Sequence, residues 1–159
     1  ATQFARVHAV LVVGKGTGAG AVVDFARRYG HPVLGARLDP APDAVKALER
    51  RKAFAFAGIG DPEKFFMTLA SAGIAATIEE SFADHHDYSE DEAARILARC
   101  EAERLVPVTT EKDVVRLTGQ DGARGRLAAA AKAVPVTLVP DEPETLRKLL
   151  REALVAARS

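Results

Sequence analysis

A strand turns directly into a helix in the segment Ala53-Phe54-Ala55-Phe56-Ala57-Gly58-Ile59-Gly60-Asp61-Pro62. The short run of Ala and Phe residues predicts a buried strand, and the two glycines end it. Asp61 then suits the N-cap of a helix and Pro62 its first helical position. A strand followed at once by a helix is the repeating unit of α/β proteins.

Further apolar segments alternate with helical patterns along the whole chain. Short apolar runs predict five more strands, at residues 7–13, 33–38, 74–80, 105–108 and 134–139. Helices with apolar residues three and four positions apart separate them. The chain of 159 residues is therefore expected to form a single α/β domain over residues 1–159. The predicted fold is a mostly parallel, Rossmann-like or P-loop-type sheet in three layers, with helices on both faces.

Composition narrows the class of protein. Hydrophobic residues make up 48% and charged residues 28% of the chain, as in a globular protein. Lys and Arg together number 22, as do Asp and Glu, and no basic stripe with interleaved aromatic residues exists. We therefore expect no nucleic-acid partner.

The single cysteine and the ends of the chain add two expectations. Cys100 shares one helical face with Ala93, Ile96 and Leu97, which predicts a buried core residue. Because it is the only cysteine in the sequence, an internal disulfide is excluded. No apolar run approaches the roughly 20 residues that a membrane span needs. The first residues do not form a signal peptide, and the chain begins without Met, as a piece of a longer protein would.

Four polar or glycine-rich loops follow predicted strands, at residues 14–20, 58–64, 82–89 and 109–113. In a parallel sheet every strand-to-helix loop leaves from the carboxyl edge, where ligands bind. The chemical groups of these loops are therefore expected to converge although they lie far apart in the sequence.

The first of these loops has two interpretations. Gly14-Lys15-Gly16-Thr17-Gly18-Ala19 fits a dinucleotide-binding fingerprint loosely, with Ala19 in the third glycine place and Asp39 near the usual acidic position. It is not a P-loop, because Lys15 precedes the glycines instead of following them, and no P-loop motif exists elsewhere in the chain. A flexible turn without a ligand also explains the loop and is the preferred interpretation.

Two helix starts combine capping with charge. Asp61 and Pro62 explain most of the first, but Gly58, Gly60 and Lys64 also suit an anion at a helix N-terminus. In Thr110-Glu111-Lys112-Asp113, Thr110 suits a cap, and the two carboxylates agree with the helix dipole. Lys112 opposes that dipole, which points to an anionic neighbour.

The segment Asp84-His85-His86-Asp87 is dense in groups that transfer protons or bind metals. It is consistent with a metal site, an acid–base pair or a solvated turn. Adjacent residues point in different directions, which disfavours one metal ion bound by all four. A carboxylate beside an imidazole can orient the ring for acid–base chemistry.

Three segments together resemble one known family, the tetraacyldisaccharide 4'-kinases. The first is the segment from Ala53 to Phe66, the second is Phe82-x-Asp84-His85-His86-x-Tyr88, and the third is Thr109-Thr110-Glu111-Lys112-Asp113-Val114-Val115-Arg116-Leu117. The resemblance implies a kinase of the lipid A pathway, dependent on ATP and Mg²⁺, that phosphorylates the 4'-hydroxyl of a tetraacylated disaccharide 1-phosphate. It also implies work at the cytoplasmic face of the bacterial inner membrane, with the membrane contact made by the N-terminal half.

The resemblance also implies roles for individual residues. His85 would act with an aspartate of the N-terminal half to ready the sugar hydroxyl, with His86 as its competitor for that role and Asp84 as the group that orients it. The other residues expected at the substrate and nucleotide cleft are Gly58, Gly60, Lys64, Tyr88, Thr110, Glu111, Lys112 and Asp113. No metal ligand is assigned.

The chain departs from the family pattern because it lacks the P-loop half. It is therefore expected to be the C-terminal portion of the kinase, with the N-terminal P-loop domain as its partner, and to be inactive alone. Two alternatives stay open. One is a free-standing dinucleotide-binding module that uses residues 14–20, and the other is a metal-dependent hydrolase centred on the histidines.

Overall fold

The computed structural model describes residues 7–14 and 17–157, and it divides the chain into two compact units. One unit is Pro40–Thr137, and the other combines Ala1–Asp39 with Leu138–Ser159. Lys15 and Gly16 of the first glycine loop lie outside the described residues. That the chain acts as a single domain stays a prediction, as does a dinucleotide bound by that loop.

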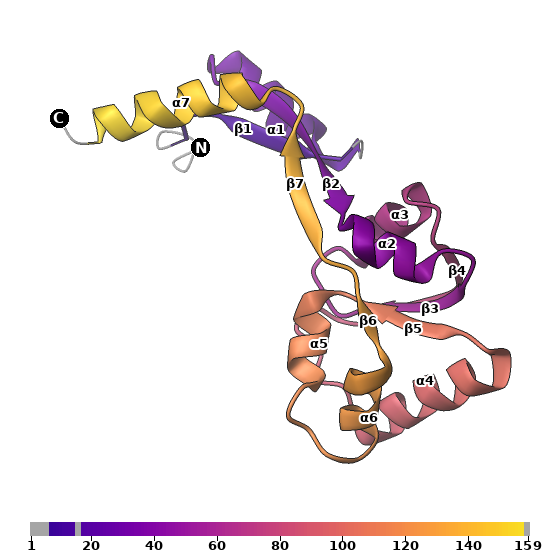
Figure 1. Ribbon diagram of the computed structural model, residues 1–159. Helices are drawn as coiled ribbons and strands as arrows, with labels where there is room; N and C mark the ends of the chain where they lie inside the picture. Colours follow the sequence, from indigo (N-terminus) through magenta and orange to yellow (C-terminus); the bar gives the residue numbers. More distant parts are fainter. Residues whose placement is uncertain (1–6, 15–16, 158–159) are drawn as a thin grey trace. The chain divides into compact units, whose positions relative to one another are not determined.

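The unit Pro40–Thr137 is built on a four-stranded sheet in the order β4-β3-β5-β6, with every pair parallel (Figure 1). Its strands are β3 (Lys52–Ala57), β4 (Ala75–Ser81), β5 (Val106–Thr109) and β6 (Lys132–Ala133). Its helices are α2 (Pro42–Leu48), α3 (Pro62–Ser71), α4 (Glu90–Glu103), α5 (Glu111–Leu117) and α6 (Gly122–Ala130).

Side chains of β3 alternate between two cores, one on each face of this sheet. Ala53, Ala55 and Ala57 pack with Leu48 of α2 and with Phe65, Phe66 and Leu69 of α3. Phe54 and Phe56 pack on the opposite face with Ile96 and Cys100 of α4 and Leu127 of α6. Burying a side chain of the size of Phe contributes roughly 1.5–3 kcal/mol, so both faces stabilise the sheet. The predicted three-layer arrangement and the burial of Cys100 are confirmed.

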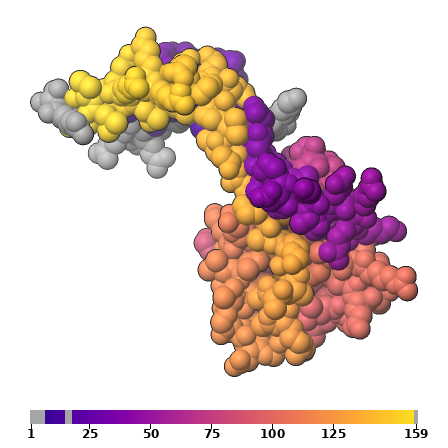
Figure 2. All heavy atoms as spheres, viewed as in Figure 1, coloured from indigo at the N-terminus to yellow at the C-terminus, as the bar shows by residue number. Residues whose placement is uncertain are grey.

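The other unit contains a three-stranded sheet in the order β1-β2-β7. Its strands are β1 (Val10–Val13), β2 (Val33–Pro40) and β7 (Val136–Pro140). The pair β1 and β2 is parallel, whereas the arrows of β2 and β7 point in opposite directions in Figure 1. Its helices are the 3-10 helix η2 (Thr17–Ala19), α1 (Gly20–Arg28) and α7 (Pro143–Ala156). No residue of α7 is buried, and no other described part of the chain covers the face of this helix that is visible in Figure 2.

The α/β class is confirmed, but the strands form two sheets instead of one. The strand predicted at residues 134–139 is found as β7 (Val136–Pro140), which begins after Pro135, a residue with no N–H for a strand ladder. The short strand β6 (Lys132–Ala133), which was not predicted, lies just before it and belongs to the other sheet. The expectation of one common edge therefore holds for the loops after β3, β4 and β5. Residues 14–20 follow β1, in the other sheet.

Candidate functional site

The loops after β3, β4 and β5 meet at the carboxyl edge of the four-stranded sheet, as predicted. The Phe82 N–H donates to the Ala57 carbonyl at 2.9 Å, and the His85 N–H donates to the Gly58 carbonyl at 3.1 Å. The Gly58 N–H donates to Asp113 Oδ1 at 3.2 Å. Backbone hydrogen bonds thus join the loop after β3 to the histidine segment, and a hydrogen bond to the Asp113 side chain joins it to α5.

Asp113 lies at the centre of this junction, and its side chain is wholly buried. Besides the Gly58 N–H, its carboxylate accepts from the Thr110 hydroxyl at 2.6 Å and from Arg116 Nη1 at 2.9 Å. A buried carboxylate is tolerated because donors surround it. Asp113 therefore supports the site from beneath and is not at its open surface.

Arg116 is the residue that sequence reasoning did not single out. Besides its bond to Asp113, its Nη1 donates to the Gly58 carbonyl at 2.6 Å, and its Nη2 lies 3.3 Å from His85 Nδ1. One guanidinium therefore touches all three loops. The only local signal in the sequence is the spacing of three residues between Asp113 and Arg116 on one helix.

His85 is presented outward on a constrained backbone. Its φ is 59°, in the left-handed region that residues other than glycine seldom adopt, and its side chain is 83% exposed. Asp84 Oδ1 accepts a hydrogen bond from the His85 backbone N–H at 3.0 Å. Asp84 Oδ2 lies 3.8 Å from His85 Nε2, too far for a hydrogen bond in this arrangement. Asp84 thus holds the backbone of His85 and lies beside its ring.

His86 faces the protein instead. Its ring stacks on Phe82 with centroids 4.7 Å apart, and its Nε2 lies 3.0 Å from Glu92 Oε2. The same carboxylate accepts from the Ser89 N–H, which completes the predicted capping box of α4. This hydrogen bond, more than any other contact, holds the pKa of Glu92 below its ordinary value. These contacts give His86 a structural role, in which it packs against Phe82 and pairs with Glu92.

Tyr88 lies in the core, with its ring edge-on to Phe56 and Phe82. Its hydroxyl is buried and makes no hydrogen bond within the described part of the chain. Burial first, and then the negative charge of Asp113, raise the pKa of Tyr88 far above its ordinary value. The structure therefore places Tyr88 under the predicted cleft, out of reach of a substrate.

Lys64 and Asp61 form an ion pair where the glycine loop ends and α3 begins. Lys64 Nζ lies 3.0 Å from Asp61 Oδ2, and the Asp61 side chain also accepts from the Lys64 N–H as the predicted N-cap. The hydrogen bond from the Lys64 side chain is the main reason that the pKa of Asp61 is lowered. A Cβ at Gly60 would lie 3.3 Å from Asp84 Oδ2, which brings this loop against the histidine segment.

Thr110 caps α5 through a hydrogen bond from the Asp113 N–H, as predicted. Glu111 and Lys112 occupy the exposed first turn of that helix. They lie on the outside of the same junction that Asp113 supports from within.

Residues 7–14 and 17–157 contain neither a cluster of metal-binding side chains nor a helix that could cross a membrane. Nowhere in these ranges do three or more His, Cys, Asp or Glu side chains gather in a way that could hold one metal ion. None of the helices described there is both long and apolar enough to cross a membrane.

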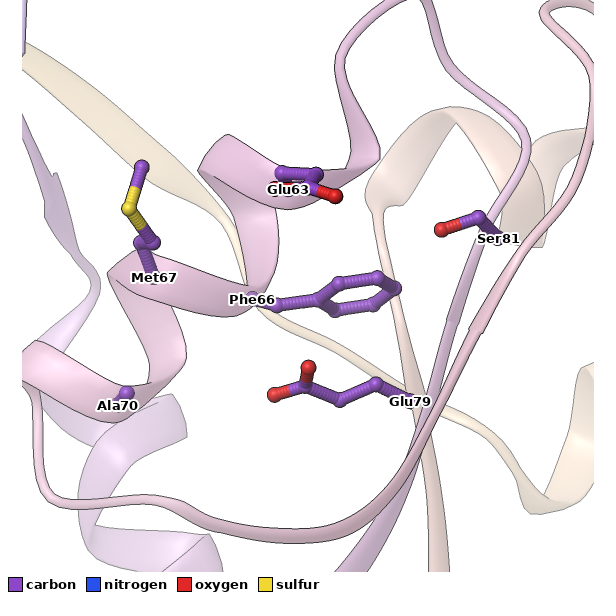
Figure 3. A pocket seen from close by; sticks show the side chains of 6 residues that line it. All are labelled: Glu63, Phe66, Met67, Ala70, Glu79 and Ser81. Carbon is purple, nitrogen blue, oxygen red and sulfur yellow. The ribbon is translucent and has the colours of Figure 1, made fainter. Parts of the chain in front are cut away.

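A separate cavity of about 370 Å³ lies between α3 and β4 (Figure 3). The Phe66 ring points into it from the helix, and the carboxylate of Glu79 lies beside this ring. The remaining lining residues are Glu63, Met67, Ala70 and Ser81. None of the predicted site residues lines this cavity, so it is distinct from the loop junction.

Comparisons with known proteins agree on one family. The family model described as tetraacyldisaccharide-1-P 4'-kinase matches residues 1–155. A tetraacyldisaccharide 4'-kinase of Bradyrhizobium sp. (strain BTAi1) is 42% identical over 98% of this chain and 45% of its own length. The corresponding protein of Rhodopseudomonas palustris (strain BisA53) is 43% identical with the same coverage, and that of Nitrobacter winogradskyi is 39% identical. No solved structure matches the chain significantly.

These relatives are all named as kinases, so the chain with this α/β fold and loop junction belongs to a class of kinases. The chain is a member of the tetraacyldisaccharide 4'-kinase family, which confirms the resemblance. It spans about half the length of the curated relatives that it matches.

Proposed function

We propose that this chain is the C-terminal part of an ATP-dependent kinase that phosphorylates the 4'-hydroxyl of tetraacyldisaccharide 1-phosphate in lipid A biosynthesis. Family membership supports the reaction, and coverage of less than half of each relative supports a further part of the enzyme. That part is the N-terminal P-loop domain, through which the enzyme contacts the cytoplasmic face of the inner membrane. The chain alone is inactive in this proposal.

The observation that carries the proposal is the placement of His85. Its ring is 83% exposed at the carboxyl edge of the sheet, while its backbone is fixed by hydrogen bonds to the glycine loop and to Asp84. An exposed imidazole on a rigid support suits hydrogen bonding to the groups that ready a substrate hydroxyl, including a second carboxylate. His85 is the catalytic histidine in this proposal, and Asp84 orients it.

The other predicted residues divide into an open set and a supporting set. Gly58, Gly60, Lys64, Thr110, Glu111 and Lys112 are proposed to line the cleft that the N-terminal domain completes. His86, Tyr88 and Asp113 are proposed to support that surface, because two are buried and the third is engaged with Glu92.

The described residues do not fit a site for Mg²⁺ of their own, because no group of three metal-binding side chains gathers among them. The sequence also contains no P-loop to hold the phosphates of ATP. ATP and Mg²⁺ are therefore assigned to the part of the enzyme outside this chain. Phosphoryl transfer depends mainly on positioning and on neutralising charge, which two facing domains can provide together.

A chimera tests the proposal. The remaining part of the Bradyrhizobium sp. (strain BTAi1) kinase is joined to this chain, and transfer of the γ-phosphate of ATP to the disaccharide is measured. The chimera should transfer phosphate, and His85→Ala should lower kcat on the order of 10²–10⁴-fold. His86→Ala serves as the matched control and should lower kcat less.

Two results would count against the proposal. A chimera that folds, as judged by its thermal unfolding, but transfers no phosphate would remove the kinase function. Unchanged activity of His85→Ala would remove the catalytic role of His85 alone.

A further inference from the structure

The Arg116 guanidinium occupies a position that restricts the chemistry of the His85 ring. Its side chain is 22% exposed, and Nη1 is fixed by two acceptors, the Gly58 carbonyl at 2.6 Å and Asp113 Oδ1 at 2.9 Å. These acceptors belong to different elements, so they fix the orientation of the guanidinium independently of His85. Nη2 then points to His85 Nδ1 at 3.3 Å.

The direction of this last hydrogen bond follows from the donor inventory. A guanidinium has only N–H donors and no acceptor. His85 Nδ1 must therefore accept, which requires a lone pair on Nδ1. The ring proton then resides on Nε2, at the edge of the ring that lies beside Asp84 and faces outward.

We propose that Arg116 is a positioning residue that holds His85 in the tautomer with an unprotonated Nδ1 and an N–H at Nε2. In this state His85 offers a hydrogen-bond donor to an incoming carboxylate or hydroxyl oxygen, and its other nitrogen is already engaged. The consequence for catalysis rests on the proposed function, whereas the tautomer itself can be measured in this chain alone.

The first experiment reads the tautomer directly. The ring nitrogens of the 15N-labelled chain are observed by NMR, and the signals of His85 are assigned by their loss in His85→Gln. Nδ1 should show the shift of an unprotonated ring nitrogen. In Arg116→Lys the shifts should move toward the tautomer mixture of a free imidazole. Lysine keeps a positive charge beside Asp113, but its single nitrogen cannot also reach His85 as the second guanidinium nitrogen does.

Arg95→Lys is the matched control. Arg95 pairs with Glu80 and makes no contact with His85. This variant should leave the His85 signals unchanged. A proton on Nδ1 in the unmodified chain, or identical His85 shifts in the unmodified chain and Arg116→Lys, would overturn the proposal. The first of these outcomes is observed in the unmodified chain and needs only the assignment from His85→Gln, so it decides even if Arg116→Lys unfolds.

The second experiment separates this proposal from the proposed function. In the chimera, Arg116→Lys should lower kcat about tenfold and leave KM for ATP unchanged, because the residue acts through His85. If the chimera is inactive throughout, the kinase function fails and the NMR result still decides the role of Arg116. Full activity of Arg116→Lys together with a changed tautomer would refute the catalytic consequence.

Discussion

The carboxylate of Asp113 accepts a hydrogen bond from the backbone N–H of Gly58, 55 positions earlier in the chain, at 3.2 Å. This bond joins the loop after β3 to helix α5. Arg116 binds the same carboxylate and the carbonyl of the same glycine. Gly58 is thus held through both of its backbone polar groups, and the shape of its loop depends on one buried charge.

Asp113→Asn is expected to lower the free energy of unfolding by about 2–4 kcal/mol. The substitution removes the charge opposite a partly buried guanidinium and places an amide N–H₂ where only acceptors are needed. Urea unfolding followed by circular dichroism measures the change. Asp121→Asn is the control, because Asp121 is exposed and makes no side-chain capping bond to α6, and it should change the stability by less than about 0.5 kcal/mol. Equal losses in the two variants would refute the central role of Asp113.

Gly58→Ala is expected to destabilise the protein by about 1–3 kcal/mol. A Cβ there would lie 3.0 Å from His86 Cβ and 3.2 Å from both Asp113 Oδ1 and the Tyr88 hydroxyl. The loop must therefore move away from α5, and thermal unfolding measures the cost. Gly20→Ala has open space around its Cβ at the start of α1 and should cause no loss. A Gly58→Ala protein as stable as the parent would show that the junction is looser than these distances indicate.

Tyr88→Phe should keep the stability within about 1 kcal/mol, because the buried hydroxyl makes no hydrogen bond among the described residues. Tyr88→Ala should cost about 3–5 kcal/mol, since it removes a whole ring from the core. Urea unfolding of the pair separates the hydroxyl from the ring. A large loss in Tyr88→Phe would reveal a partner for the hydroxyl.

Glu92 is expected to make the stability depend on acid. Its folded-state pKa lies below the ordinary value of 4.5, so its contribution is fully present above pH 4.5 and is lost as the pH falls through the lower, folded-state value. Glu92→Gln should therefore lose less stability than the parent between pH 5 and pH 3. Urea midpoints across this range measure the slope. Glu101→Gln, on an exposed position of the same helix, should follow the parent. A Glu92→Gln curve as steep as that of the parent would contradict the assignment.

Local features of this fold could be predicted from the sequence. Asp61, Ser89 and Thr110 cap their helices as expected, because each bonds to a group three positions along the chain. The order of strands and loops followed from the same short-range patterns. The convergence of three loops at one sheet edge then needed only the parallel topology.

Long-range contacts could not be predicted in the same way. Arg116 reaches Gly58 and His85 across 58 and 31 positions, and no local pattern encodes either separation. The burial of Tyr88 and Asp113 depends on the layers that cover them, so motif residues were expected at a surface that they do not reach. The placement of β6 and β7 in different sheets depends on which neighbouring strands are available to pair on each side of Pro135.

The left-handed backbone of His85 makes this residue thermodynamically unfavourable at its own position. A residue with a Cβ costs about 1 kcal/mol or more in this region, where glycine is free of strain. His85→Gly is therefore expected to raise the melting temperature while it removes the imidazole. The backbone bonds to Gly58 and Asp84 persist in such a variant, since they use only the N–H. At this one residue, greater stability and the proposed chemistry exclude each other.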